Sequence, residues 1–153
     1  MALVYLGIGS NLGNRKANCL RSIELLSSHV ISVTRKSALY ETEPWGIKEQ
    51  PGYINMAIEA NTDLTHEELL IALKSIEKDM GREAGPRWGP RLIDLDLLLY
   101  DDLVLDTDIL TLPHPFLHDR DFVLEPLAEI APDVIHPRLN KNIAQLLREV
   151  KHS

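Results

Sequence analysis

One apolar segment, residues 87–100, constrains the fold of this chain more than any other. It reads R-W-G-P-R-L-I-D-L-D-L-L-L-Y, so a basic stretch broken by glycine and proline leads into an apolar run interrupted only by Asp94 and Asp96. Leucine-rich runs of this length, bounded by turn residues, are typical of buried strands. Side chains alternate along a strand, so both aspartates point to one face, and Leu95 and Leu97 point to the other. The sequence therefore predicts a strand with one apolar face and one acidic face.

Two carboxylates on an otherwise apolar strand need a cationic partner, because burying an unpaired charge is costly. Salt bridges to nearby arginines would meet this need. A hard divalent cation such as Mg²⁺ would also meet it, since Mg²⁺ prefers oxygen ligands and shares them with substrate phosphates. Arg82, Arg87 and Arg91 lie directly upstream, and guanidinium groups bind phosphate oxygens in a fork geometry. We therefore interpret Asp94 and Asp96 as the metal ligands of a phosphoryl-transfer site.

The overall charge makes this local group of arginines informative. The chain has 153 residues, a formal net charge of −7 and 44% hydrophobic residues, which is ordinary for one globular domain spanning residues 1–153. The acidic balance argues against a nucleic-acid partner or a membrane surface. No run reaches membrane length and no signal-like segment opens the chain, while the lone Cys19 excludes an internal disulfide. We expect a cytoplasmic protein that is a monomer rather than a dimer.

Strand and helix patterns alternate along the rest of the chain. Strand patterns cover residues 2–8, 30–42, 53–60 and 103–105, and helix patterns cover 14–28, 65–80, 124–131 and 142–150. Thr65 and Glu68 match a capping box at the start of the second helix, and Gly81 is a natural stop after it. The order predicts an α+β fold, a ferredoxin-like split βαβ sandwich with a βαββαβ core, an additional hairpin and C-terminal helices.

Four further residues could contact a ligand. Tyr53 and Asn55 share one face of the strand 53–60, where a planar polar ligand could stack on the ring and hydrogen-bond the amide. His114 lies between two prolines in a stiff extended backbone, from which its imidazole could donate to a phosphate. Glu77, near the end of the apolar helical stripe, could face the same ligand. All four residues also have an ordinary structural interpretation.

The glycines of the first loop do not complete a dinucleotide-binding fingerprint. The segment 7–13 reads G-I-G-S-N-L-G, so its third glycine comes one residue later than G-x-G-x-x-G requires. The segment 30–40 also has no acidic residue at the expected distance. A dinucleotide site is therefore not expected here.

Four motifs together resemble one enzyme family. They are G-I-G-S-N-L-G at 7–13, Y-x-T-x-P-W-G at 40–46, Q-P-x-Y-x-N at 50–55 and R-W-G-P-R-x-x-D-x-D-L-L at 87–98. The chain resembles, over nearly its whole length, the 6-hydroxymethyl-7,8-dihydropterin pyrophosphokinases. The resemblance implies an enzyme of folate biosynthesis that transfers the pyrophosphoryl group of ATP to the pterin hydroxymethyl oxygen and releases AMP. It also implies dependence on Mg²⁺, a closing lid and no covalent intermediate.

The resemblance assigns roles to individual positions. Asp94 and Asp96 would hold two Mg²⁺ ions together with ATP, and Arg82 and Arg91 would join them as catalytic residues. The pterin would be bound by Thr42, Pro44, Trp45, Tyr53, Asn55 and Phe122. The nucleotide would be bound by Glu77, Arg82, Trp88, Arg91, Leu97, His114 and Arg120. Ala84 and Ile109 stand where other members carry arginine, and Arg87 is a candidate replacement for one of them.

Two other classes of protein would fit the same fold. A regulatory module that binds a small ligand without turnover would keep Tyr53 and Asn55 but would not need the two aspartates. An RNA-binding module would need basic residues and stacking aromatic residues on the central strands of the sheet. The acidic strand and the net charge favour the enzyme.

Overall fold

The computed structural model describes residues 1–42, 52–81 and 92–152. Its centre is a five-stranded sheet in which every pairing is antiparallel. The strands are β1 (Ala2–Ser10), β2 (Ile31–Lys36), β3 (Tyr40–Thr42), β4 (Tyr53–Thr62) and β5 (Asp94–Tyr100). Their order is β5-β1-β4-β2, and β3 pairs with the first residues of β4. Among the described strands, β1 and β4 are therefore central and β5 lies at an edge.

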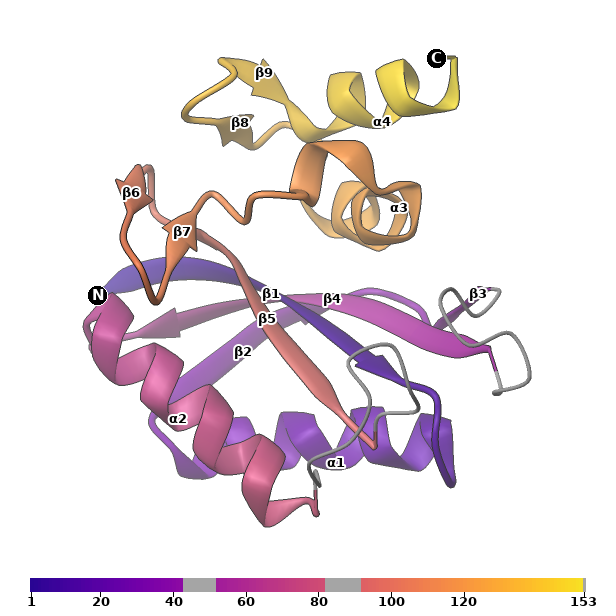
Figure 1. Ribbon diagram of the computed structural model, residues 1–153, viewed down its shortest axis with the longest axis vertical. Helices are drawn as coiled ribbons and strands as arrows, with labels where there is room; N and C mark the ends of the chain where they lie inside the picture. The colour runs from indigo at the N-terminus through magenta and orange to yellow at the C-terminus, as the bar shows by residue number, and fades with distance from the viewer. Residues whose placement is uncertain (43–51, 82–91, 153) are drawn as a thin grey trace.

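Helices lie on both sides of this sheet (Figure 1). α1 (Arg15–Ser28) and α2 (His66–Asp79) cover one face, whereas α3 (Asp121–Ile130) lies across the other and α4 (Ile143–Lys151) packs on α3. The smaller elements are β6 (Leu105–Asp106), β7 (Thr111–Leu112), the 3-10 helix η1 (Leu117–Asp119), β8 (Ile135–His136) and β9 (Lys141–Asn142). The antiparallel sheet with helices agrees with the predicted α+β class. No helix within residues 1–42, 52–81 or 92–152 is both long and apolar enough to span a bilayer.

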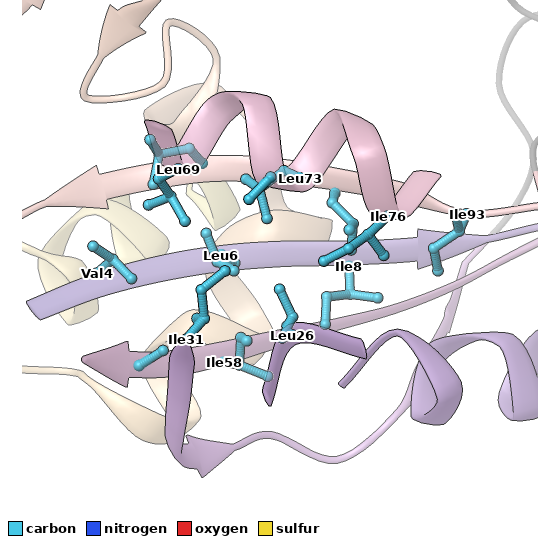
Figure 2. Packing of buried hydrophobic residues seen from close by; sticks show 14 of the residues in the cluster. Val4, Leu6, Ile8, Leu26, Ile31, Ile58, Leu69, Leu73, Ile76 and Ile93 are labelled. Atoms are coloured by element: carbon cyan, nitrogen blue, oxygen red, sulfur yellow. The ribbon is translucent and has the colours of Figure 1, made fainter. Parts of the chain in front are cut away.

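The face covered by α1 and α2 holds the main hydrophobic core (Figure 2). Val4, Leu6 and Ile8 alternate along β1 and are at most 2% exposed. α2 and its C-cap supply the predicted apolar stripe, which is Leu69, Leu73, Ile76 and Met80. Each such fully buried side chain contributes about 1.5–3 kcal/mol relative to an exposed one. The apolar residues that repeat every two positions in β1 thus pack against those that repeat about every 3.6 positions in α2.

Local sequence signals set the ends of α2. The Oγ1 of Thr65 accepts from the Glu68 amide at 3.1 Å, and Glu68 Oε1 accepts from the Thr65 amide at 2.9 Å. The predicted capping box is therefore confirmed. Gly81 follows the C-cap with φ +88°, a left-handed conformation that glycine adopts without a steric cost.

Some local expectations were wrong. The predicted strand 30–42 is two strands, β2 and β3, and Val30 precedes β2 with φ 65°. The predicted strand 103–105 is displaced to the hairpin of β6 and β7, and the hairpin of β8 and β9 was not predicted. Strands of two residues contain no alternation, so a period-two pattern cannot locate them.

The apolar stripe of α1 also differs from its expected composition. The apolar positions of the predicted helix 14–28 are Cys19, Leu20, Ile23 and Leu26. Cys19 and Leu26 are buried as this pattern predicts, but Leu20 is 45% exposed and Ser22 is fully buried in its place. The Ser22 hydroxyl donates to the Cys19 carbonyl at 2.7 Å. Because this bond satisfies the hydroxyl within the helix, a serine can occupy a position that hydropathy assigns to an apolar residue.

The second face of the sheet is covered over only part of its area. Tyr5 and Leu98 form a smaller core there with Leu124 and Leu127 of α3. Beyond this cluster the same face is open and lined by a pocket. The position of α3 therefore decides where a ligand can reach the sheet.

Candidate active site

Asp94 and Asp96 lie on the open part of the second face. In the register between β1 and β5, Asp94 is opposite Gly9 and Asp96 is opposite Gly7. Leu95 is buried in the main core on the other side of the sheet. Both aspartates and both glycines line the same pocket, which we call the sheet pocket. The prediction that the two carboxylates share one face is confirmed.

Gly7 and Gly9 form the floor of the sheet pocket. A Cβ atom at Gly9 would lie 3.1 Å from Asn55 Oδ1 and 3.6 Å from Tyr53 Cδ1. The missing side chains leave space above the β1 backbone that a ligand can enter. Sequence reasoning tested these glycines only as a nucleotide loop. Glycine inside a strand pattern is the signal that could have identified them, because it marks a close approach of a ligand to the backbone.

Aromatic and amide side chains form one wall of the sheet pocket. Tyr53 and Asn55 come from β4, as predicted from their shared face, and Phe122 comes from the first turn of α3. The Asn55 amide nitrogen donates to Thr42 Oγ1 at 2.9 Å. This bond fixes the orientation of the amide and ties Thr42 to the pocket.

His114 borders the sheet pocket in the segment before α3. Its backbone amide donates to the Leu98 carbonyl at 3.0 Å, and its Nδ1 accepts from the Phe116 amide at 3.2 Å. Burial and the nearby charge of Arg120 lower the pKa of His114 to about 4. The imidazole is therefore neutral at pH 7, and because Nδ1 is an acceptor, the ring can donate from Nε2.

Arg120 connects the aromatic wall with the acidic strand. Its guanidinium carbon lies 4.6 Å from the centroid of the Phe116 ring and 5.6 Å from that of Phe122. Burial lowers the pKa of Arg120, while the carboxylates of Asp96 and Asp119 oppose that shift. Arginine keeps its charge under these conditions, so a fixed cation faces the sheet pocket.

A second pocket opens between α2 and the β6–β7 hairpin, and we call it the hairpin pocket. Leu70, Lys74 and Glu77 line it on α2, and residues 107–111 line it on the hairpin. Asp96 and His114 border both pockets. Two ligands could therefore bind side by side with their reacting groups near one carboxylate and one imidazole.

Glu77 makes a contact that its sequence position did not reveal. The residue is buried, with 6% exposure, and its Oε2 accepts from the Leu95 amide at 2.8 Å. The bond joins two residues that are 18 positions apart, so no local pattern indicates it. Glu77 also borders the hairpin pocket, and its predicted contact with a nucleotide stays a prediction.

Five predicted site residues lie outside the described residues. They are Pro44, Trp45, Arg82, Trp88 and Arg91. Within the described part of the chain, no group of three or more His, Cys, Asp or Glu side chains is placed to hold a metal ion. The pair Asp94 and Asp96 is instead the kind of donor set that suits Mg²⁺, which keeps water and takes further oxygen ligands from phosphates.

The chain matches known proteins along most of its length. A family model described as 7,8-dihydro-6-hydroxymethylpterin-pyrophosphokinase matches residues 5–132. A 2-amino-4-hydroxy-6-hydroxymethyldihydropteridine pyrophosphokinase of Aquifex aeolicus is 44% identical over 149 residues, which cover 97% of this chain and 92% of the relative. The protein of the same name from Bacillus subtilis is 42% identical, with 86% of this chain and 80% of the relative covered.

Larger proteins contain a matching part. The mitochondrial folate synthesis bifunctional protein of Pisum sativum is 46% identical over 83% of this chain, which spans 25% of that protein. A crystal structure of Plasmodium falciparum HPPK-DHPS shares the fold with a TM-score of 0.75 and 16% identity, covering 97% of this chain and 43% of the solved one. The family model and the relatives matched over most of their own length agree. The chain therefore belongs to the 7,8-dihydro-6-hydroxymethylpterin-pyrophosphokinase family and is an enzyme of pyrophosphoryl transfer.

Proposed function

We propose that this enzyme transfers the pyrophosphoryl group of ATP to the hydroxymethyl oxygen of 6-hydroxymethyl-7,8-dihydropterin and releases AMP, as a step of folate biosynthesis. Membership of the family supports the reaction. The single observation that carries its assignment to this site is the meeting of two pockets at Asp96 and His114. Each substrate can occupy one pocket while the transferred group lies at their boundary.

The sheet pocket suits the pterin. Tyr53 and Phe122 offer aromatic faces to a planar ring, and offset stacking of this kind contributes about 0.5–1.5 kcal/mol beyond burial. Asn55, held by its bond to Thr42, keeps its carbonyl oxygen available to a ring N–H. The low floor at Gly9 lets the ring approach the β1 backbone.

The hairpin pocket suits the nucleotide, because it reaches from an apolar end near Leu70 to the acidic strand at Asp96. Leu97, also in its lining, would contact the nucleotide. Asp94 and Asp96 would hold two Mg²⁺ ions with the triphosphate, and the metal would supply neutralisation of the phosphate charge. The carboxylates fit this role because both line the sheet pocket from one face of β5, and Asp96 also borders the hairpin pocket.

His114 and Arg120 supply hydrogen-bond donors and positive charge. The neutral His114 ring donates from Nε2 to a phosphate oxygen, and Arg120 offers its guanidinium to the same anion. Transfer in line between two bound substrates needs no nucleophile on the protein, so no covalent intermediate forms. The side chains contribute position and charge.

The remaining parts of the proposal concern residues outside the described ranges. Arg82, Trp88 and Arg91 would belong to a lid that closes over the nucleotide. Pro44 and Trp45 would border the pterin. Ile109 stands where other members are expected to carry arginine, and it is 71% exposed beside the hairpin pocket. Because isoleucine is uncharged, this position would contribute no positive charge to the phosphates.

We further infer that the core has the ferredoxin-like arrangement expected from the sequence. The strand order β5-β1-β4-β2, with α1 and α2 on one face, supports this assignment. A monomer working in the cytoplasm, with ATP and the pterin as its ligands, completes the proposal.

Incubation with ATP, Mg²⁺ and the pterin, followed by chromatography of the nucleotides, tests the reaction. AMP should form in amounts equal to the pterin pyrophosphate and should not form when the pterin is omitted. A module that only binds a small ligand would bind the pterin without releasing AMP. An RNA-binding module would instead shift RNA at low salt and leave ATP intact.

The metal assignment has its own test in Asp96→Ala. Loss of one carboxylate at the boundary of the two pockets should lower turnover by about 10³-fold or more and weaken binding of ATP with Mg²⁺. Asp102→Ala is the matched control, because Asp102 is exposed in the turn that follows β5. Near-native turnover of Asp96→Ala at ordinary Mg²⁺ would refute the assignment.

A further inference from the structure

The strand that carries both aspartates lies at the edge of the described sheet. β5 pairs with β1 along one side. On its other side the Leu95 amide donates to Glu77 Oε2 at 2.8 Å. Leu95 is the residue between Asp94 and Asp96, so this bond fixes the backbone from which both carboxylates project.

Glu77 departs from the apolar pattern of its own helix. The neighbouring inward positions of α2 are Leu73 and Ile76, and Glu77 is buried beside them with 6% exposure. Burying a carboxylate costs free energy unless it is hydrogen-bonded. A bond between an ionised carboxylate and an amide is shorter and about twice as strong as a neutral one. A helix that needed only packing at this position would be served equally well by an apolar side chain.

We propose that Glu77 is a positioning residue for Asp94 and Asp96 and acts through the Leu95 amide. The rotation of β5 about its axis sets the direction of both aspartate side chains at once, because they are two residues apart on one face. One anchor between them therefore controls the direction of both metal ligands. Groups that orient metal ligands in this way typically change metal affinity or activity by about 10–100-fold when they are removed. This inference rests on the proposed metal role of the two aspartates.

Two substitutions of similar volume separate the hydrogen bond from the charge. Glu77→Gln removes the charge but keeps a carbonyl oxygen that can accept from Leu95. Glu77→Met fills similar space and removes the oxygen acceptor. We expect Glu77→Gln to keep the Mg²⁺ concentration for half-maximal turnover within about threefold of the native value, and Glu77→Met to raise it by about tenfold or more.

Two measurements without turnover accompany the kinetics. The exchange rate of the Leu95 amide proton, followed by NMR, should be slow in the native protein and in Glu77→Gln and much faster in Glu77→Met. Binding of Mn²⁺ in the presence of a non-hydrolysable ATP analogue, followed by electron paramagnetic resonance, should weaken in Glu77→Met by the same factor as the Mg²⁺ requirement.

Glu68→Ala is the matched control on the same helix. Glu68 also accepts a backbone amide through its carboxylate, from Thr65 at 2.9 Å, but at the opposite end of α2. Its loss should lower the midpoint of thermal unfolding without changing the requirement for Mg²⁺.

Three outcomes would overturn the proposal. Equal losses in Glu77→Gln and Glu77→Met would show that the charge itself acts on the ligand. A lower unfolding midpoint in Glu77→Met with unchanged Mn²⁺ binding would show a purely structural role. If Glu77→Met does not fold, a folded Glu77→Gln with weakened metal binding refutes the inference, and unchanged binding supports it. Failure of the native enzyme to bind Mn²⁺ with the nucleotide would instead reject the metal assignment itself.

Discussion

The two faces of the central sheet are built in opposite ways, and β1 contributes to both. On the face under α1 and α2, Leu6 and Ile8 are 0% and 2% exposed and fill the main core. On the other face, Gly7 and Gly9 have no side chains and form the floor of the sheet pocket. One strand therefore stabilises the fold with alternate residues and leaves space for a ligand with the residues between them.

The polar groups follow the same division. The open face carries Asp94, Asp96 and Asn55, which are groups that cost stability when they are buried without partners. The packed face carries large apolar side chains in direct contact with two helices (Figure 2). Substitutions on the two faces should therefore separate into losses of stability and losses of activity.

The largest effect is expected on the packed face. Leu6→Ala removes a side chain with no exposed surface and leaves a cavity between β1 and the helices. The free energy of unfolding should fall by about 2–5 kcal/mol, while turnover per folded molecule should stay near the native value. Urea unfolding and steady-state kinetics at low temperature would measure both. A large drop in turnover with little loss of stability would break the division between the faces.

Acid should lower the free energy of unfolding through His114, which borders the sheet pocket on the open face. The pKa of His114 is lowered to about 4 in the folded protein, whereas an unfolded histidine titrates near 6.5. Between these values the unfolded chain binds more protons, so stability is complete above about pH 6.5 and falls as the pH decreases towards 4. A loss on the order of 2–3 kcal/mol is expected over this range.

The comparison of native protein with His114→Gln isolates that contribution. Unfolding in urea at several pH values between 7 and 4 should give a flatter profile for the variant. His136 also has a pKa lowered by burial, so some dependence should remain in both proteins. Identical slopes would show that His114 does not stay neutral in the fold.

A smaller effect is expected from adding one methyl group to the floor of the sheet pocket. In Gly9→Ala the new Cβ would lie 3.1 Å from Asn55 Oδ1, closer than an ordinary contact. Displacing the amide should weaken pterin binding by about tenfold, on the order of 1–2 kcal/mol, with less than about 1 kcal/mol change in stability. Fluorescence titration with the pterin would measure it.

The double variant Gly9→Ala, Asn55→Ala provides the control. If the methyl group acts by crowding the amide, the two losses should not add, because the second substitution removes the group that the first displaces. Additive losses would mean that the methyl group blocks the ligand itself.

The packed face and the acidic strand were predictable because their signals are local. The period of the apolar residues located α2, and the capping box of Thr65 and Glu68 located its start. The alternation along β5 placed Asp94 and Asp96 on one face before any partner strand was known. Each of these signals lies within one element.

The rest depended on segments that are distant in the sequence. The hydrogen bond from Leu95 to Glu77 and the place of Phe122 beside Tyr53 arise only when α2, β5, α3 and β4 are assembled. The same is true of Gly9, whose function as a floor depends on Asn55 in the neighbouring strand. Strand and helix periods contain no information on such pairs. The resemblance to the family suggested that Tyr53 and Phe122 share one site, whereas neither the bond of Glu77 nor the role of Gly9 was predicted.

The smallest change in stability is expected at the ends of α1 and α2, the two helices that cover the packed face. The two helices end differently. Gly81 follows α2 with φ +88°, and Val30 follows α1 with φ 65°. A branched side chain in this left-handed region is strained by roughly 1–2 kcal/mol. Val30 is 66% exposed, so burial of its side chain contributes little stability to offset that strain. Val30→Gly should therefore raise the free energy of unfolding by about 0.5–1 kcal/mol, since the relief of strain exceeds the added entropy of the unfolded chain. Gly81→Ala should do the reverse. Among the described residues its Cβ would meet only Leu92, at an ordinary 3.7 Å, so the expected cost comes from the positive φ. Urea unfolding of both variants decides the matter, and a destabilised Val30→Gly would show that the valine side chain contributes more to the packed face than its exposure indicates.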